Sequence, residues 1–228
     1  MLERYLAEGN VIGASSVESL DGGLLLMFSS VDGKHFLKSY DNFRTVSESW
    51  IVPMDSMTAS ANLFRLSDGR LMMTIRKISR RPEIAAIIGA DFYLAFSDDD
   101  GHTFAEGKRI NSEEKCYYLM NDRIRRTHTG RILIPICHIP DEYTDEKYFE
   151  KCGYAGCFYS DDEGETWSVS DWVCGESVDQ LAEPMIAQGS DDIIHMYMRT
   201  GYGYLYYSKS RDNGETWEDE KPSMLRSP

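Results

Sequence analysis

Short apolar runs separated by polar turns recur along the whole chain. Four of them, each four to eight residues long, are rich in Leu, Ile, Met and Tyr and follow an Asp-Gly, Thr-Gly or Asp-Asp turn. These runs are 22–28, 69–75, 130–136 and 192–198. Runs of this length between turn residues are typical of β-strands, and no segment shows a sustained helical period with caps at both ends. The pattern predicts an all-β protein.

A second pattern, Ser-x-Asp-x-Gly-x-Thr-aromatic, occurs three times, at 97–104, 160–167 and 210–217. Ser, Asp and Thr at these offsets suit a tight turn closed by side-chain hydrogen bonds to its own backbone, and Gly can take a positive φ. A degenerate copy at 39–46 has Phe43 in place of Gly and Val46 in place of the aromatic residue. We expect one shared geometry for the three intact turns and a rebuilt turn at 39–46.

An apolar run precedes every octet, and a turn with another apolar run precedes that. Each period therefore predicts a four-stranded antiparallel sheet whose last hairpin carries the octet, which is a β-propeller blade. We count four blades, at approximately 11–50, 51–111, 112–173 and 174–223, within a single domain covering 1–228.

The octets resemble the Asp-box, or bacterial neuraminidase (BNR), repeats of the sialidase superfamily. The resemblance extends through NDRIRRTHTGRILIPICHIP (121–140), YSDDEGETW (159–167), LAEPMIAQ (181–188) and MYMRTGYGYLYYSKSRDNGETW (196–217). It implies a sialidase-type β-propeller, six-bladed in the family, with about four blades in this chain. We therefore expect an incomplete propeller with open sheet edges. Asp boxes also occur in proteins that are not glycosidases, so they identify the blade and not the reaction.

Composition narrows the classes of partner. A formal net charge of -14 argues against nucleic acid, because phosphate binding needs clustered Lys and Arg. No apolar run has the length of a membrane span and no signal peptide begins the sequence, which predicts a cytoplasmic protein, with secretion open if the start is incomplete. The five cysteines lack paired CxxC spacing, which favours free thiols over a zinc site. We expect a glycan ligand, no metal, no cofactor, and self-association through the open sheet edges as an alternative.

Aligning the repeats on the turn before the second strand shows which residues share a place in the blade. Glu183 aligns with Asp122 and Ala61, and Arg199 aligns with His138 and Lys77. In a propeller these positions reach the central funnel where ligands bind. Here they vary toward charged residues.

Glu183 and Arg199 are the leading candidates. Because Pro184 restricts the residue before it, we expect an extended backbone at Glu183 that gives its carboxylate a fixed direction. The resemblance implies that Glu183 polarises a tyrosine nucleophile. It also implies that Arg199 is the second of three arginines that bind the C1 carboxylate of sialic acid, which suits the planar fork of a guanidinium. The alternatives are a surface Glu at a strand end and a salt bridge, perhaps between Arg199 and Glu183 themselves.

Further candidates lie in the second and third blades. His138 ends a strand and is a candidate acid, base or hydrogen-bond donor to a sugar, or a structural hydrogen-bonding residue. Asp122 is a third catalytic candidate, or pairs with a neighbouring arginine. Four residues complete the predicted substrate-binding set: Arg76, Lys77, Arg123 and Asn121. The stretch 76–83 is either a basic loop over the funnel or a solvated linker.

The sequence also departs from the sialidase pattern. The family's first arginine has no counterpart, since Ala14, Ser15, Ala61 and Asn62 stand at the corresponding strand starts. The third arginine and the tyrosine belong to blades that follow these four. Two hypotheses result. One is a sialidase-like exo-glycosidase that acts on a terminal acidic sugar through a tyrosine nucleophile instead of paired carboxylates. The other is a non-catalytic carbohydrate-binding propeller, or an enzyme of the same fold that uses His138 on another glycan.

Overall fold

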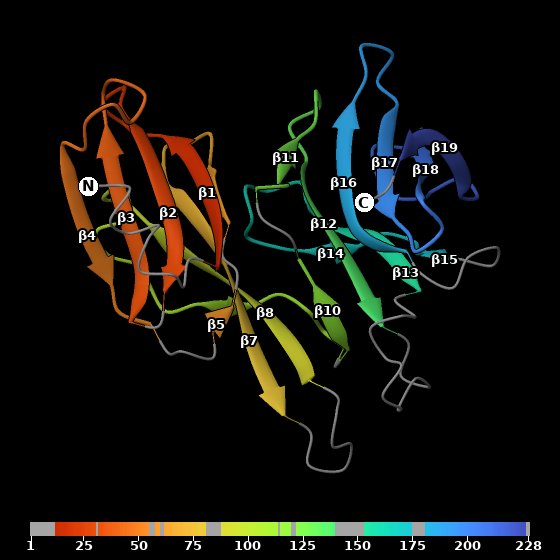
Figure 1. The fold of residues 1–228 in the computed structure, drawn as a ribbon, viewed down its shortest axis with the longest axis horizontal. Helices are drawn as coiled ribbons and strands as arrows, with labels where there is room; N and C mark the ends of the chain where they lie inside the picture. The colour runs from red at the N-terminus through yellow and green to blue at the C-terminus, as the bar shows by residue number, and fades with distance from the viewer. Residues whose placement is uncertain are drawn as a thin grey trace. The chain divides into compact units, whose positions relative to one another are not determined.

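The computed structural model describes residues 12–30, 32–54, 58–59, 62–80, 88–113, 115–119, 122–139, 153–174 and 181–226. The chain forms two compact units (Figure 1). Unit 1 comprises Met1–Ile78 and Asp91–Asn111, and unit 2 comprises Ser79–Ala90 and Ser112–Pro228. Each unit is described by itself. Among the described residues, no helix is long and apolar enough to cross a lipid bilayer.

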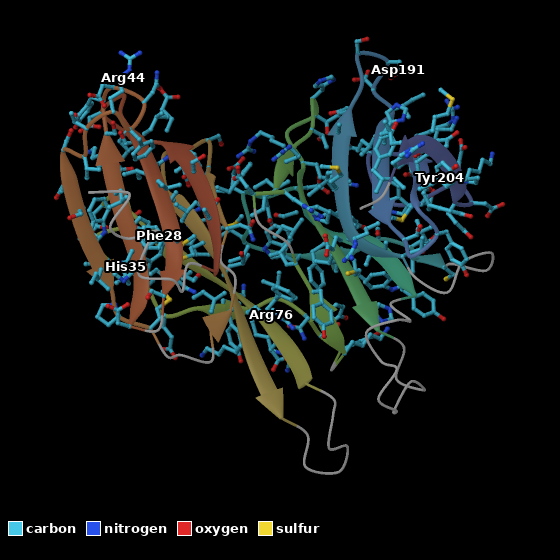
Figure 2. All side chains as sticks on the ribbon, viewed as in Figure 1. Phe28, His35, Arg44, Arg76, Asp191 and Tyr204 are labelled. Atoms are coloured by element: carbon cyan, nitrogen blue, oxygen red, sulfur yellow. The ribbon has the colours of Figure 1, made fainter. Side chains whose placement is uncertain are left out.

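The first sheet of unit 1 is antiparallel and has its strands in sequence order. Its strands are β1 (Ile12–Glu18), β2 (Leu24–Ser30), β3 (Gly33–Ser39) and β4 (Glu48–Val52). Phe28 of β2 faces His35 of β3, and their rings stack with centroids 5.0 Å apart (Figure 2). Such cross-strand pairs fix the register of the two strands.

The second group of strands in unit 1 is built around one long hairpin. Its strands are β5 (Thr58–Ala59), β6 (Leu63–Arg65), β7 (Leu71–Arg80), β8 (Ile88–Ser97) and β9 (Lys108–Arg109). Both β5 and β6 pair with β7, and β9 pairs with β8. The core of unit 1 joins this group to the first sheet through Leu25, Met27, Phe36, Leu63, Leu71, Met73, Ile75 and Ala95.

Unit 2 contains the remaining two groups of strands. The third group is β10 (Cys116–Tyr118), β11 (Arg125–Arg126), β12 (Ile132–Ile139), β13 (Tyr154–Ser160), β14 (Ser168–Val169) and β15 (Val173–Cys174). The fourth is an antiparallel sheet of β16 (Ala182–Gln188), β17 (Ile194–Arg199), β18 (Tyr204–Ser210) and β19 (Lys221–Arg226). The core between them contains Leu133, Ala155, Cys157, Val173, Leu181, Ile186, Ile194, Met196 and Met198.

The three intact Asp-box octets form the turns that follow β8, β13 and β18. In the 97–104 turn, Ser97 Oγ accepts a hydrogen bond from the Gly101 amide at 2.8 Å. The Asp99 carboxylate accepts from the Thr103 amide at 2.8 Å and from its hydroxyl at 2.7 Å. The same bonds recur in the octets that begin at Ser160 and Ser210. The predicted turn chemistry is confirmed.

The degenerate copy at 39–46 makes the same turn, so the expectation of a rebuilt turn was wrong. Ser39 Oγ accepts from the Phe43 amide at 2.9 Å, and Asp41 accepts from the Thr45 amide at 2.9 Å and hydroxyl at 2.8 Å. Phe43 adopts φ +60°, so a non-glycine residue takes the left-handed conformation in this copy. The Ser, Asp and Thr side chains are sufficient to hold the turn.

In three of the four groups the first strand is bulged or interrupted near its start. In β1 the register shifts next to Gly13, which has φ +71°. In the third group β10 and β11 both pair with β12, and Asp122, with φ +55°, lies between them. In β16 the register shifts between Ala182 and Met185. These irregular strand starts share a left-handed residue although their side chains differ.

The prediction of an all-β fold with four propeller-type blades is confirmed by these four groups of strands. The second and third groups are joined by one parallel pairing, between Ala90 of β8 and Cys116 of β10. The described strands of the groups span 12–52, 58–109, 116–174 and 182–226. A single domain, self-association through open edges and a cytoplasmic location stay predictions.

Candidate functional site

Glu183 lies at the bulge of β16 and adopts φ +49°. The expectation that Pro184 would keep Glu183 extended was wrong. The register shift between Ala182 and Met185 inserts an extra residue, and bulged residues often leave the extended region. A left-handed non-glycine residue costs on the order of 1–3 kcal/mol, and such strain persists only where surrounding contacts hold it.

The Glu183 carboxylate lies between two arginines of unit 2. Arg199 Nη1 donates to Glu183 Oε1 at 3.1 Å. Arg123 Nη2 lies 4.0 Å from Glu183 Oε2. The side chains of Arg199, Glu183 and Arg123 are 45%, 33% and 21% exposed, respectively. The structure therefore forms the predicted Glu183–Arg199 pair and leaves its guanidinium open to solvent.

Arg123 contacts the backbone of the bulge as well as the carboxylate. Its Nη1 donates to the carbonyl oxygen of Glu183 and, at 3.1 Å, to that of Pro184. Burial lowers the pKa of Arg123, while the charge of Glu183 acts against that shift. The guanidinium remains protonated under any ordinary condition. The sequence reasoning placed Arg123 among the substrate-binding residues and missed these backbone contacts, because no local motif connects residues 60 positions apart.

Asp122 occupies the irregular strand start of the third group, as Glu183 does in the fourth. It is exposed and has φ +55°. Its carbonyl oxygen accepts a hydrogen bond from Arg125 Nη1 at 3.1 Å. Asp122 and Glu183 thus share a left-handed backbone, but Asp122 lies four residues before Arg126 and Glu183 five before the equivalent Gln188, so their predicted alignment is not supported by the strand pairing. A catalytic role of Asp122 stays a prediction.

The predicted alignment of Arg199 with His138 and Lys77 was wrong by one residue. Ile132 pairs with box residue Ser160, and Ile194 pairs with box residue Ser210, so the two isoleucines are equivalent. Counting along β12 and β17 from them places Arg199 level with Cys137. The pairing of Leu71 with Arg65 in the second group likewise makes Arg76, not Lys77, the counterpart of Arg199. A shift of one residue moves a side chain to the opposite face of a strand.

His138 is packed among aromatic rings. It is 5% exposed, stacks on Tyr154 with ring centroids 4.8 Å apart, and meets Trp172 edge-on at 4.5 Å. Tyr117 contributes a second edge contact at 6.0 Å. This packing resembles the structural alternative more than the catalytic one, and the catalytic role of His138 stays a prediction.

The remaining predicted residues belong to unit 1 or lie outside the described residues. Arg76 and Lys77 belong to β7 of unit 1, and Figure 2 shows Arg76 on that strand. The Lys77 ammonium lies 4.5 Å from the centroid of the Tyr93 ring, which is a cation–π distance. Arg76 to Arg80 continue strand β7, so the expectation of a loop or linker was wrong for this part of 76–83, and residues 81–83 and Asn121 lie outside the described residues.

Metal and thiol chemistry find little support in the described part of the chain. No group of three or more His, Cys, Asp or Glu side chains there is arranged to hold a metal ion. Cys137 and Cys157 are buried and Cys174 is exposed, all as free thiols. Burial raises the pKa of Cys157, which keeps it protonated and unreactive.

Comparisons with known proteins connect this geometry to a family. The sequence model of the BNR repeat-like domain matches residues 81–228, more than half of the chain. An anhydrosialidase from Macrobdella decora is 28% identical over 142 residues, which cover 57% of this chain and 17% of that protein. The chain therefore spans less than a fifth of the length of this curated relative.

Two solved structures share the fold. A protein of unknown function from Dyadobacter fermentans superposes with a TM-score of 0.73 at 18% identity, over 93% of this chain and 68% of that one. The intramolecular trans-sialidase from Ruminococcus gnavus, solved with oseltamivir carboxylate, superposes with a TM-score of 0.66 at 14% identity, over 94% and 71%. At these identities the likeness concerns the fold alone.

The Asp-box turns, the propeller-type sheets and the match of the family model agree with one another. The chain belongs to the BNR repeat-like domain family and is a sialidase-like BNR-repeat protein.

Proposed function

We propose that the protein acts on a terminal acidic sugar of glycans, as a sialidase-like exo-glycosidase. The observation that carries the proposal is the Glu183–Arg199 pair, joined at 3.1 Å with the Arg199 side chain 45% exposed. The spacing of the two residues and their places on β16 and β17 match the roles that the family resemblance implies for them.

Arg199 would recognise the sugar. A guanidinium presents five N–H donors in a planar fork that matches a carboxylate. Arg199 uses Nη1 for Glu183, and its exposed side chain is accessible to the C1 carboxylate of a sialic acid. The anionic sugar would then share this cation with Glu183.

Glu183 would act as the base that polarises the hydroxyl of a tyrosine nucleophile. Its left-handed backbone and its two arginine neighbours fix the direction of the carboxylate. A base must lie within hydrogen-bond reach of the proton that it takes, so this fixed direction is the property that catalysis requires. The nucleophile itself is assigned by the resemblance to a later blade.

The test measures release of N-acetylneuraminic acid from 3′-sialyllactose by the full-length protein. We expect Glu183→Gln to lower kcat about 10²–10⁴-fold, the usual contribution of a positioned base. We expect Arg199→Gln to raise KM roughly 10–100-fold, the value of about 1.5–3 kcal/mol for a hydrogen bond to a charged group.

Glu163→Gln is the matched control. Glu163 is also left-handed, with φ +57°, is 29% exposed and pairs with Arg126 at 2.5 Å, but it belongs to an Asp-box turn. Its kinetics should equal those of the wild type. Equal losses of kcat in Glu163→Gln and Glu183→Gln would show that both variants lose activity because the fold is destabilised. That result would contradict the proposed role of Glu183.

A non-catalytic carbohydrate-binding propeller is the second candidate, and one observation favours it. At the strand start where the family has its first arginine, Ser15 is buried and its Oγ accepts from the Leu63 amide at 2.9 Å. The side chain at that position therefore bonds within the protein interior instead of binding a ligand. Calorimetric binding of N-acetylneuraminic acid that weakens in Arg199→Gln, without any hydrolysis of sialosides, would establish this candidate. Absence of both binding and hydrolysis would refute the two together.

A further inference from the structure

Arg123 makes a kind of contact that a ligand-binding arginine does not need. One of its nitrogens, Nη1, donates to the carbonyl oxygens of both Glu183 and Pro184. In an extended strand successive carbonyl groups point to opposite sides, so one donor cannot reach two of them. The convergence of these two oxygens exists only because β16 is bulged and Glu183 is left-handed.

The same guanidinium is poorly placed for a ligand. The Arg123 side chain is 21% exposed, against 45% for Arg199, and burial already lowers its pKa. Its second terminal nitrogen, Nη2, faces Glu183 Oε2 at 4.0 Å. From its place just before β11, Arg123 therefore contacts the backbone of Glu183 and Pro184 and the carboxylate of Glu183.

The contact also crosses between strand groups of unit 2. Arg123 lies between β10 and β11 of the third group, whereas Glu183 begins β16 of the fourth. Strained conformations at functional sites persist when neighbouring structure over-determines them. Two carbonyl contacts and one charge contact from the partly buried Arg123 supply that restraint here.

We infer that Arg123 is a positioning residue that holds Glu183 in its left-handed conformation and aims its carboxylate, while Arg199 alone of the two arginines binds the acidic sugar. The inference rests on the proposed function for what the aimed carboxylate does, but the restraint on Glu183 can be measured without any substrate. The opposing account, in which Arg123 binds the substrate directly, makes the opposite predictions for both measurements.

The first measurement is the NMR signature of the Glu183 backbone in the 228-residue chain. A residue with positive φ has its amide and α protons unusually close and gives a strong intraresidue NOE between them. We expect this NOE at Glu183 in the wild type and in Arg199→Gln, and its loss in Arg123→Gln. Should Arg123→Gln fail to fold, Arg123→Lys keeps the charge but not the fork and is expected to lose the NOE as well.

Arg126→Gln is the matched control for this measurement. Arg126 pairs with left-handed Glu163 at 2.5 and 2.9 Å and also donates to the Gly130 carbonyl oxygen at 3.0 Å. Its loss should leave the NOE of Glu183 unchanged. A Glu183 NOE that survives in Arg123→Gln overturns the inference, whatever the protein does to sugars.

The second measurement separates binding from turnover. We expect Arg123→Gln to lower kcat on sialyllactose at least tenfold while its affinity for N-acetylneuraminic acid stays within threefold of the wild type. Arg199→Gln should instead lose at least tenfold in affinity. Equal losses of affinity in the two variants would make Arg123 a substrate ligand and overturn the inference, with the proposed function intact. A wild type that neither binds nor hydrolyses the sugar would refute the proposed function, and the NOE comparison would still decide the role of Arg123.

Discussion

The Asp-box turns and the irregular starts of the inner strands repeat in different ways. In the boxes both the backbone and the side chains recur: the Ser Oγ accepts from the amide four residues later at 2.8–2.9 Å in all four copies. At the strand starts only the backbone recurs. Gly13, Asp122 and Glu183 all have a left-handed backbone, yet Gly13 has no side chain and the other two carry carboxylates of different length.

This difference separates the structural part of the repeat from its chemical part. A box holds itself through bonds within its own eight residues, so every copy keeps the same donors and acceptors. A strand start depends on contacts from elsewhere, as Glu183 depends on Arg123 and Arg199. Its side chain is therefore free to differ from blade to blade, which is where a site can arise.

The largest expected effect on stability comes from a substitution in the 97–104 box, where Gly101 packs against Phe36 of β3 and Leu71 of β7. A Cβ added at Gly101, which has φ +90°, would lie 2.9 Å from Phe36 Cε1 and 3.3 Å from Leu71 Cδ2. Left-handed strain of roughly 1–2 kcal/mol and overpacking of roughly 1–3 kcal/mol then add. We expect Gly101→Ala to lower the free energy of unfolding by about 3 kcal/mol, as measured by urea denaturation.

Gly22→Ala controls for the backbone term. Gly22 also belongs to unit 1 and has φ +83°, but an added Cβ would meet nothing within 4 Å. The expected loss is about 1 kcal/mol, from left-handed strain alone. If the two variants lose the same stability, packing of the box against Phe36 contributes nothing.

The next effect tests whether the degenerate box is equivalent to the intact ones. Ser39→Ala and Ser97→Ala each remove a buried hydroxyl that accepts from the backbone, at 2.9 and 2.8 Å. A buried amide left without its acceptor costs roughly 1–3 kcal/mol. We expect equal losses of about 2 kcal/mol in thermal or urea unfolding. A much smaller loss in Ser39→Ala would show that the copy with Phe43 is held by other contacts.

The sequence predicted the boxes, which are held by local contacts, better than the strand starts, which depend on distant residues. The boxes were predictable because Ser, Asp and Thr act within a few residues of one another, and even the degenerate copy follows from those three residues. The Glu183–Arg199 pair was predictable as a salt bridge, since β16 and β17 are adjacent.

The failures have long-range or cumulative causes. Proline restricts the preceding residue only locally, and that preference was overridden at Glu183 by the bulge and by Arg123 from 60 positions away. No periodicity in a single sequence marks a bulge of that kind. The alignment of Arg199 with His138 failed for a different reason: the turn before β17, closed by Gly189 and Ile193, was placed one residue out against the turn before β12, closed by Thr127 and Arg131.

A smaller pair of effects compares Arg131, which binds residues of two boxes, with Arg199, which binds Glu183 at a strand start. Arg131 is 10% exposed in its side chain and binds Asp161 through two contacts of 2.7 Å and Glu215 at 2.9 Å. Its acidic partners are half exposed or more, so we expect Arg131→Gln to cost about 2 kcal/mol, less than the 3–5 kcal/mol of a fully buried pair.

Arg199→Gln should cost at most about 1 kcal/mol, because an exposed pair contributes little to stability. Both variants are compared with the wild type by urea denaturation. A larger loss in Arg199→Gln than in Arg131→Gln would assign the Glu183–Arg199 pair to the framework and remove the distinction between boxes and strand starts.

The smallest expected effect is the dependence of the boxes on acid. Partial burial acts to raise the pKa of Asp212, but hydrogen bonds from Thr216 and Ser210 outweigh it and lower the pKa to about 2. A carboxyl group with a lowered pKa in the folded protein contributes stability above its unfolded value, near 3.8, and loses it as the pH falls toward about 2. Asp212→Asn should therefore lose less stability than the wild type between about pH 4 and about pH 2, although its stability at neutral pH is lower.

The control is Asp219→Asn, which changes an exposed carboxylate outside the boxes. The urea midpoints of the variants are measured across this pH range. Identical pH profiles for the two variants would mean that the box carboxylates hold their turns by shape alone, whereas a flatter profile in Asp212→Asn would show that their charge is part of the turn.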